Sequence, residues 1–136
     1  MNDDEMLKEI LENTKTIASV GLSGNEEKVS HWIGVYLMGA GYRVIPVNPT
    51  LDKFLGEKAY PDLESIPDEI DVVQIFRRPE DVPPIVEDAI KIGAKVVWMQ
   101  EGIVNEEAAQ RAREAGLKVV MDICMRVTHQ RLIGPV

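Results

Sequence analysis

The sequence predicts an α/β fold, a doubly wound parallel sheet of five strands in the order 3-2-1-4-5 with helices on both faces. Short, apolar, β-prone runs alternate along the chain with longer segments in which apolar residues recur at helical spacing. Glycine, proline and asparagine separate the two kinds of segment. Strands that alternate with helices pair in parallel through right-handed crossovers, so helices should cover both faces of the sheet.

The composition is that of an ordinary globular domain, with 136 residues of which 45% are hydrophobic and 28% are charged. We expect one domain over residues 1–136, with residues 1–14 as a leading helix. The first residues are acidic and the apolar runs are far shorter than a membrane span, so we expect a cytoplasmic protein without membrane contact. The net charge of −8 argues against a nucleic-acid partner. A single cysteine excludes an internal disulfide. One cysteine and two histidines are also too few for a structural zinc site.

Five apolar runs are predicted to be the strands, and each ends in a polar or small-residue break. They are residues 15–20, 42–47, 71–76, 94–99 and 117–121. The segment between the second and third runs is a long irregular connection, in which only residues 58–60 could form a short extended piece.

The helices are predicted from apolar spacing and from the residues at their ends. The helix from Glu26 should stop at the glycines of residues 39–41, and the next should start after Asp81 with two prolines in its first turn. Asn105 and Asp122 should cap the last two helices. The alanine-rich helix over residues 106–115 could pack closely against a second copy, which would suit a homo-oligomer.

The first predicted strand runs into a small-residue turn, Gly21-Leu22-Ser23-Gly24-Asn25, and a helix follows. The first N–H groups of such a helix lack partners and point at the turn, so an anion placed there meets donors and a favourable dipole. This order predicts a phosphate-binding loop. In a doubly wound sheet the loops at Ser23, Asn48, Arg77 and Gln100 should converge on one crevice at the carboxyl edge of the strands.

A dinucleotide fingerprint is not matched. Ser23 and Glu26 stand where the second and third glycines of Gly-x-Gly-x-x-Gly belong, and Asn48-Pro49 follows the second strand in place of an acidic residue. A protein that binds another phosphate-bearing nucleotide is therefore favoured, and an NAD(P)-binding redox protein is the alternative.

Four segments together resemble the small CoA-binding Rossmann-like domains, which also form the N-terminal domain of the succinyl-CoA synthetase alpha subunit. They are Val-Gly-x-Ser at residues 20–23, Gly-Tyr-x-Val through Pro-Val-Asn-Pro at 41–49, Val-x-x-Ile-Phe-Arg-Arg-Pro-Glu at 72–80, and Trp-Met-Gln-Glu-Gly at 98–102. The resemblance covers about residues 16–132. It implies that the chain binds CoA or an acyl-CoA.

The resemblance also implies where the cofactor lies. The loop after the first strand meets the phosphates, the ends of the second and third strands border the nucleotide, and the end of the fourth lies along it. Because the chain is acidic overall, nearby basic residues should compensate the phosphate charge. The predicted contacts are Gly21, Ser23, Gly24, Asn25, Lys28, Asn48, Pro49, Lys53, Phe76, Arg77, Arg78, Met99, Gln100 and Glu101.

The chain departs from the family pattern at three places. Thr50 replaces a basic residue after Asn-Pro, with Lys53 as the nearest substitute. Ile123 and Thr128 stand where the family commonly has arginine and glutamate. The functions of those two family residues do not transfer to this chain.

Two features of the sequence favour catalysis as an alternative to binding. Gly21 to Asn25 approaches a nucleophile elbow, with Asp122 and His129 later in the chain, but the fifth position is not glycine. Cys124 at a helix start could be a nucleophile, although most lone cysteines are buried small side chains. With no catalytic constellation and no ligase domain in sight, we expect a stand-alone binding protein. An enzyme or acyl-transfer partner acting on CoA thioesters is the alternative.

Overall fold

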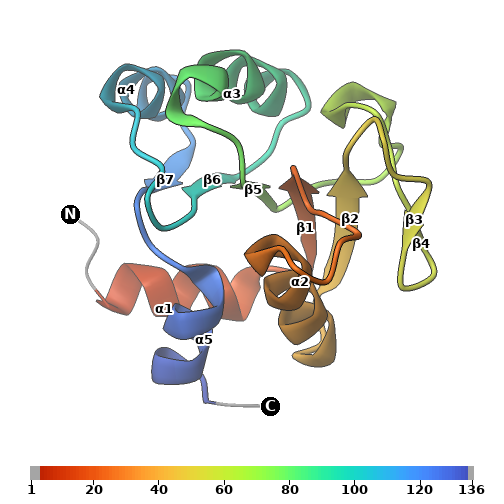
Figure 1. Ribbon diagram of the computed structural model, residues 1–136. Helices are drawn as coiled ribbons and strands as arrows, with labels where there is room; N and C mark the ends of the chain where they lie inside the picture. Colours follow the sequence, from red (N-terminus) through yellow and green to blue (C-terminus); the bar gives the residue numbers. More distant parts are fainter. Residues whose placement is uncertain (1–3, 135–136) are drawn as a thin grey trace.

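The computed structural model describes residues 4–134 and builds them around a central sheet of five parallel strands (Figure 1). The strands are β1 (Thr16–Val20), β2 (Arg43–Val47), β5 (Val72–Ile75), β6 (Val96–Met99) and β7 (Lys118–Val120). A small antiparallel hairpin, β3 (Lys53–Phe54) with β4 (Glu57–Lys58), follows β2.

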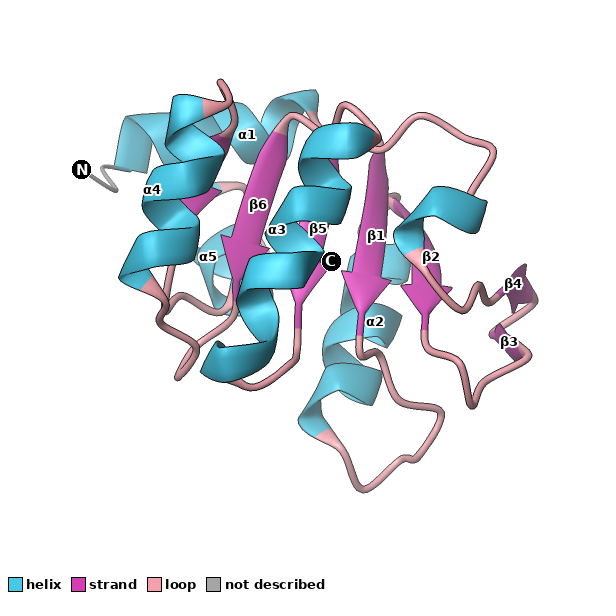
Figure 2. Ribbon diagram, turned by 90° about the horizontal axis from the view of Figure 1, so that it is seen from above, coloured by secondary structure: helices cyan, strands magenta, loops and turns pink. Residues whose placement is uncertain are grey.

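Helices cover both faces of this sheet, as predicted (Figure 2). One face carries α3 (Val82–Lys91) and α4 (Glu106–Glu114). The other carries α1 (Asp4–Asn13), α2 (Val29–Gly39) and α5 (Met125–Leu132). Two short 3-10 turns, η1 (Leu63–Ser65) and η2 (Pro79–Asp81), lie in the connections on either side of β5. Within the described residues, no helix has the length and apolar character needed to cross a bilayer.

The strands are apolar on both faces because each face packs against a helical layer. Val73 and Val97 point into the layer of α3 and α4, whereas Val72 and Trp98 point into the layer of α1, α2 and α5. The alanines of α4 lie inside the first layer, where their small side chains pack against the sheet and α3. These alanines are therefore used within the chain, and packing of this helix against a second copy stays a prediction.

The doubly wound order is confirmed, but one strand fills a different place in it. The segment predicted as third strand, β5, pairs with β1 and β6 in the middle of the sheet, giving β2-β1-β5-β6-β7. The place beyond β2 belongs to Tyr60, which forms a single parallel bridge with Val47. Counted with Tyr60 as third strand, the order begins 3-2-1-4-5. The direction of winding therefore reverses between β1 and β5, and the loops after these two strands flank the crevice.

Two helix starts differ from the prediction. α2 begins at Val29, after a turn in which the side chain of Asn25 accepts the N–H of Glu27. α5 begins after Cys124, because Asp122 adopts a left-handed backbone (φ 63°) and its carboxylate accepts the N–H of Gly102 at 2.6 Å. Asn105 caps α4 as predicted, accepting the N–H of Ala108 at 2.9 Å.

Candidate functional site

The loop after β1 is locked to the neighbouring strand ends by Gly21. Its N–H donates to the carbonyl of Val47 at 2.9 Å, and its φ of 91° is a conformation that favours glycine. A Cβ at this position would lie 3.1 Å from the carbonyl oxygen of Phe76 and 3.3 Å from Nε of Arg77. The loop therefore lies directly beside the end of β5, at the reversal point of the sheet.

The rest of the loop has backbone donors that the protein leaves free. The hydroxyl of Ser23 accepts the N–H of Asn25 at 3.0 Å, which holds the turn, and Ser30 Oγ accepts the N–H of Ser23 at 3.1 Å. The N–H groups of Gly24, Glu26, Val29 and Ser30 find no acceptor within residues 4–134. Four free donors at and before a helix start make an anion-binding arrangement.

The end of β2 holds the loop in place. The side-chain amide of Asn48 donates to the carbonyl of Leu22 at 3.1 Å, and its oxygen accepts the N–H and the hydroxyl of Thr50. Both ends of this amide are thus used inside the protein, and the adjoining Pro49 is exposed. Asn48 therefore positions the two loops relative to each other.

The segment that leads into the β3–β4 hairpin lies against the same loop, and the hairpin itself packs against α2. Leu51 lies 3.0 Å from the place that a Cβ on Gly24 would occupy, and the ring of Phe54 packs edge-on against His31 of α2. Lys53 stands directly opposite Lys58 in the hairpin, so two like charges share one face. Lys58 also lies over the ring of Tyr60, 5.2 Å from its centre.

The two arginines after β5 differ in their partners. Arg78 is bound to Asp81 at 3.2 Å, and this hydrogen bond and charge raise the pKa of its guanidinium. Arg77 is half-buried beside Gly21 and has no carboxylate within 4.0 Å among the described residues. Phe76 packs partly into the layer of α1, α2 and α5.

The end of β6 is mostly interior. Met99 is completely buried, and the buried Gln100 accepts hydrogen bonds from Gln74 at 3.1 Å and from the N–H of Met125 at 3.0 Å. Gln74 in turn accepts the hydroxyl of Ser19 at 3.0 Å. The side chains of Met99 and Gln100 therefore face the core, and the placement of these residues along CoA stays a prediction. Glu101 is exposed.

A pocket of about 400 Å³ opens between the loops after β6 and β7 and helix α5. Glu101, Asp122, Cys124 and Val127 are among its lining residues. Ser23 and His129 do not form the hydrolase arrangement with Asp122, since His129 Nδ1 pairs with the hydroxyl of Tyr36 at 2.8 Å and Asp122 is bound to Gly102.

The distribution of ion pairs distinguishes one part of the carboxyl edge of the sheet. Several cations of the chain have a carboxylate partner, for example Arg43 with Glu57 and Asp68. Within residues 4–134, four cations around the loop and hairpin have none within 4.0 Å. They are Lys28, Lys53, Lys58 and Arg77.

A family described as CoA binding domain matches residues 15–130, which covers β1 to α5 and every loop of the crevice. The chain belongs to the CoA-binding domain family. The resemblance inferred from its motifs is thereby confirmed.

Relatives of this CoA-binding domain fall into two groups. The uncharacterized protein YneT of Bacillus subtilis is 46% identical over 90% of this chain and 91% of its own length. A hypothetical protein from Pyrococcus horikoshii has a solved structure with TM-score 0.94 and 46% identity, covering 97% of this chain and 93% of that one. Acetate–CoA ligase [ADP-forming] II of Archaeoglobus fulgidus is 31% identical over 72% of this chain, which spans 15% of the ligase.

Sequence reasoning missed two residues of this CoA-binding domain's crevice. Lys58 was outside the predicted contacts, and only its cross-strand register with Lys53 reveals it. Ser30 holds the N–H of Ser23 from the first turn of α2, a contact that depends on the delayed helix start. Hairpin register and helix start are both set by tertiary contacts, so neither has a clear local signal.

Proposed function

We propose that this chain is a stand-alone CoA or acyl-CoA binding protein, with the CoA phosphates held at the loop between β1 and α2. The observation that carries the proposal is the coincidence of free donors and free cations. The loop has four backbone N–H groups without acceptors, and unpaired Lys28 and Arg77 flank it. In a chain of net charge −8, such cations supply local compensation for a diphosphate.

The predicted contacts take distinct roles in this proposal. Gly21 and Gly24 let the phosphates approach the backbone, and Ser23, Asn25, Lys28 and Arg77 provide donors or charge. Pro49 and Phe76 border the nucleotide, with Lys53 nearby and Arg78 at the outer rim. Asn48, Met99 and Gln100 hold the loops from inside, and Glu101 lies along the pantetheine arm.

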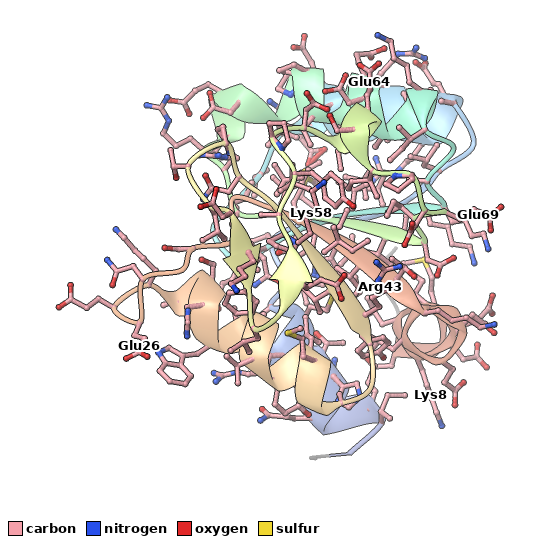
Figure 3. All side chains as sticks on the ribbon, turned by 90° about the vertical axis from the view of Figure 1, so that its right-hand side faces the viewer. Lys8, Glu26, Arg43, Lys58, Glu64 and Glu69 are labelled. Carbon is pink, nitrogen blue, oxygen red and sulfur yellow. The ribbon has the colours of Figure 1, made fainter. Side chains whose placement is uncertain are left out.

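The acidic residues of the loop are compatible with a bound phosphate. Glu26 lies on the part of the β1–α2 loop that projects from the body of the protein (Figure 3). The side chains of Glu26 and Glu27 are exposed, so they can turn toward solvent while the backbone faces the ligand.

Isothermal titration calorimetry with CoA, NAD and FMN tests the proposal. We expect a dissociation constant for CoA on the order of 1 μM, which corresponds to about −8 kcal/mol, and a rise in melting temperature with added CoA. NAD or FMN bound at least as tightly as CoA would reject the proposal and favour the redox alternative.

A loop variant locates the phosphates. Gly24→Val should weaken CoA binding while the sheet stays folded, because the added side chain meets only the flexible end of Leu51 but covers the loop backbone. Gly39→Ala is the matched control, since a Cβ there meets nothing within 4 Å and Gly39 ends α2. Equal CoA affinity of wild type and Gly24→Val would place the phosphates elsewhere.

The ligase relatives favour one variation, in which this chain presents CoA thioesters to a partner that performs acyl transfer. Their printed names describe acetate–CoA ligases, of which this chain spans a small part. Transfer of a labelled acyl group from acyl-CoA by the purified chain alone would instead make it an enzyme in its own right. We propose a cytoplasmic location, without nucleic-acid or membrane partners. A homo-oligomer stays a prediction, which native mass spectrometry tests.

A further inference from the structure

The carboxyl edge of the sheet changes charge along its length. The loops after β1, β2 and β5 and the β3–β4 hairpin carry the unpaired cations Lys28, Lys53, Lys58 and Arg77. The loops after β6 and β7 carry Glu101 and Asp122 instead, and both line the pocket of about 400 Å³ beside α5. One end of the edge is therefore suited to phosphates and the other is not.

This polarity orients an elongated ligand such as CoA. Its phosphates belong at the cationic end, over β1 and β2, so its thiol end must extend toward β6 or leave the protein. β6 lies two strand spacings from β1, roughly 10 Å across the sheet. An extended pantetheine arm can bridge that separation along Arg77 and Glu101.

The acidic side of the pocket has no compensating cation. Asp122 is fixed by its bond to the Gly102 N–H, and neither it nor Glu101 has a basic partner within 4.0 Å among the residues that the structure describes. Arg131 also lines the pocket, but its guanidinium is bound to Asp4 at 2.9 Å. Ile123 and Val127 add apolar surface to the same pocket.

We infer that this pocket receives the thiol end of CoA, and the acyl group of an acyl-CoA, and that it favours uncharged acyl groups over those that carry a carboxylate. The inference rests on the proposed CoA-binding function and adds the ligand's direction and its acyl class. The physical reason is that the carboxylate of such an acyl group would enter a pocket that already has two uncompensated carboxylates and apolar walls.

Butyryl-CoA and succinyl-CoA test this directly, because both have four-carbon acyl chains and differ in a terminal carboxylate. By calorimetry we expect butyryl-CoA to bind roughly three- to tenfold more tightly, the range for two partly exposed charge interactions. The ratio should shrink as salt is raised from low to molar ionic strength, because exposed charges are then screened.

Two variants assign the effect to the pocket. Glu101→Gln and Asp122→Asn should each move the affinity ratio of butyryl-CoA to succinyl-CoA toward one. Asparagine tolerates the left-handed backbone at residue 122 and keeps an oxygen for the Gly102 N–H. Glu12→Gln, an exposed change on α1, is the control and should leave the ratio unchanged.

The outcomes separate this inference from the function beneath it. Failure of CoA itself to bind overturns both. If CoA binds but the two acyl-CoAs bind equally, or succinyl-CoA binds more tightly, only the acyl selectivity is overturned. A preference for butyryl-CoA that persists unchanged in both pocket variants shows that the acyl group lies elsewhere, which also overturns the inference.

Discussion

The two edges of the sheet use their charged residues in opposite ways. At the amino edge, Asp71 accepts the N–H groups of Lys15 at 2.9 Å and Thr16 at 3.0 Å and pairs with Lys95. Lys118 is paired with Glu9 at the same edge. At the carboxyl edge, four cations have no such partners within the described part of the chain, namely Lys28, Lys53, Lys58 and Arg77.

Cavity size alone would favour the amino edge as the ligand site, whereas we propose the carboxyl edge. The amino edge has a pocket of about 490 Å³ between α1, α3 and α4, lined by the ion pairs just described. Its charged groups already satisfy one another, so that edge is built for stability. Unpaired donors and cations, which water solvates and an anion could bind, are the reason that we propose the carboxyl edge as the binding edge.

The largest effect should come from breaking the amino edge. Burial alone would raise the pKa of Asp71, but the Thr16 and Lys15 N–H groups and the Lys95 ammonium together lower it, so the carboxylate is held charged. Asp71→Ala leaves two backbone donors without their acceptor and should cost about 3 kcal/mol of unfolding free energy. Urea denaturation measures this loss.

Glu69→Ala is the control, an exposed carboxylate in the loop just before β5, and should change stability by no more than about 0.5 kcal/mol. CoA affinity of the folded protein should be the same in both variants. An Asp71→Ala protein as stable as the control would show that the amino edge is not the structural clamp described here.

The sequence predicted the architecture better than the details of either edge. Apolar runs ending at a polar or small residue located all five main strands, because burial on both faces leaves a strong local pattern. The place of β5 was missed because Tyr60, the residue beyond β2, makes only one bridge. A single bridging residue has no strand-like sequence pattern, so the apolar run of β5 was predicted as the third strand instead.

The same limit applies to the candidate site. The Gly21 loop and Arg77 could be predicted because strand ends in a doubly wound sheet meet at one edge. The inward turn of Gln100 could not, since it depends on Gln74 in the neighbouring strand and on the N–H of Met125. Side-chain networks that join distant segments have no signature in either segment alone.

The next effect concerns the two arginines at the carboxyl edge. Arg77→Ala should weaken CoA binding by about 2 kcal/mol, the loss expected for one charge-assisted phosphate contact, and leave stability nearly unchanged. Arg78→Ala is the matched control, since Arg78 is mostly exposed and already bound to Asp81. Calorimetric titration of the two variants with CoA measures both losses of affinity. Equal losses of CoA affinity in the two variants would mean that the lack of a carboxylate partner at Arg77 does not distinguish a CoA contact.

A smaller effect should separate the hairpin lysines from the rest of the surface. Lys53 and Lys58 share one face of the hairpin, so we predict that they read the 3′-phosphate of CoA, with Lys53 the stronger contact and Arg77 the next candidate. Wild type should prefer CoA to dephospho-CoA, and Lys53→Ala should reduce that preference by about 1 kcal/mol. Lys8→Ala on α1, far from the hairpin in Figure 3, should leave it intact. A preference for CoA that is unchanged in Lys53→Ala and in Lys58→Ala would remove the two lysines from the site.

The smallest effect is a pH dependence of stability. As the pH falls, protonation should weaken the contact between α2 and α5 before it affects Asp71 at the amino edge. α2, which begins at the end of the phosphate loop, packs on α5 through Tyr36 and His129, and burial lowers the pKa of His129. Because the folded state then binds this proton less readily than the unfolded state, stability should start to fall as pH drops below about 6.5. Asp71 has the same sign of dependence at lower pH, because the folded state lowers its pKa as well. The amino-edge clamp therefore stays charged until the pH falls below 3.8.

Urea denaturation at pH 7.5 and pH 5.5 isolates this contribution. His129→Gln should lose most of the stability difference between the two values, because glutamine can meet Tyr36 without titrating. Tyr36→Phe removes the hydroxyl but keeps the buried imidazole, so its stability should still fall on acidification. Tyr42, whose pKa burial raises to about 12, stays neutral throughout and adds nothing to the slope. If His129→Gln kept the full wild-type difference, the titrating group would lie outside the α2–α5 contact and acid would not loosen the binding edge first.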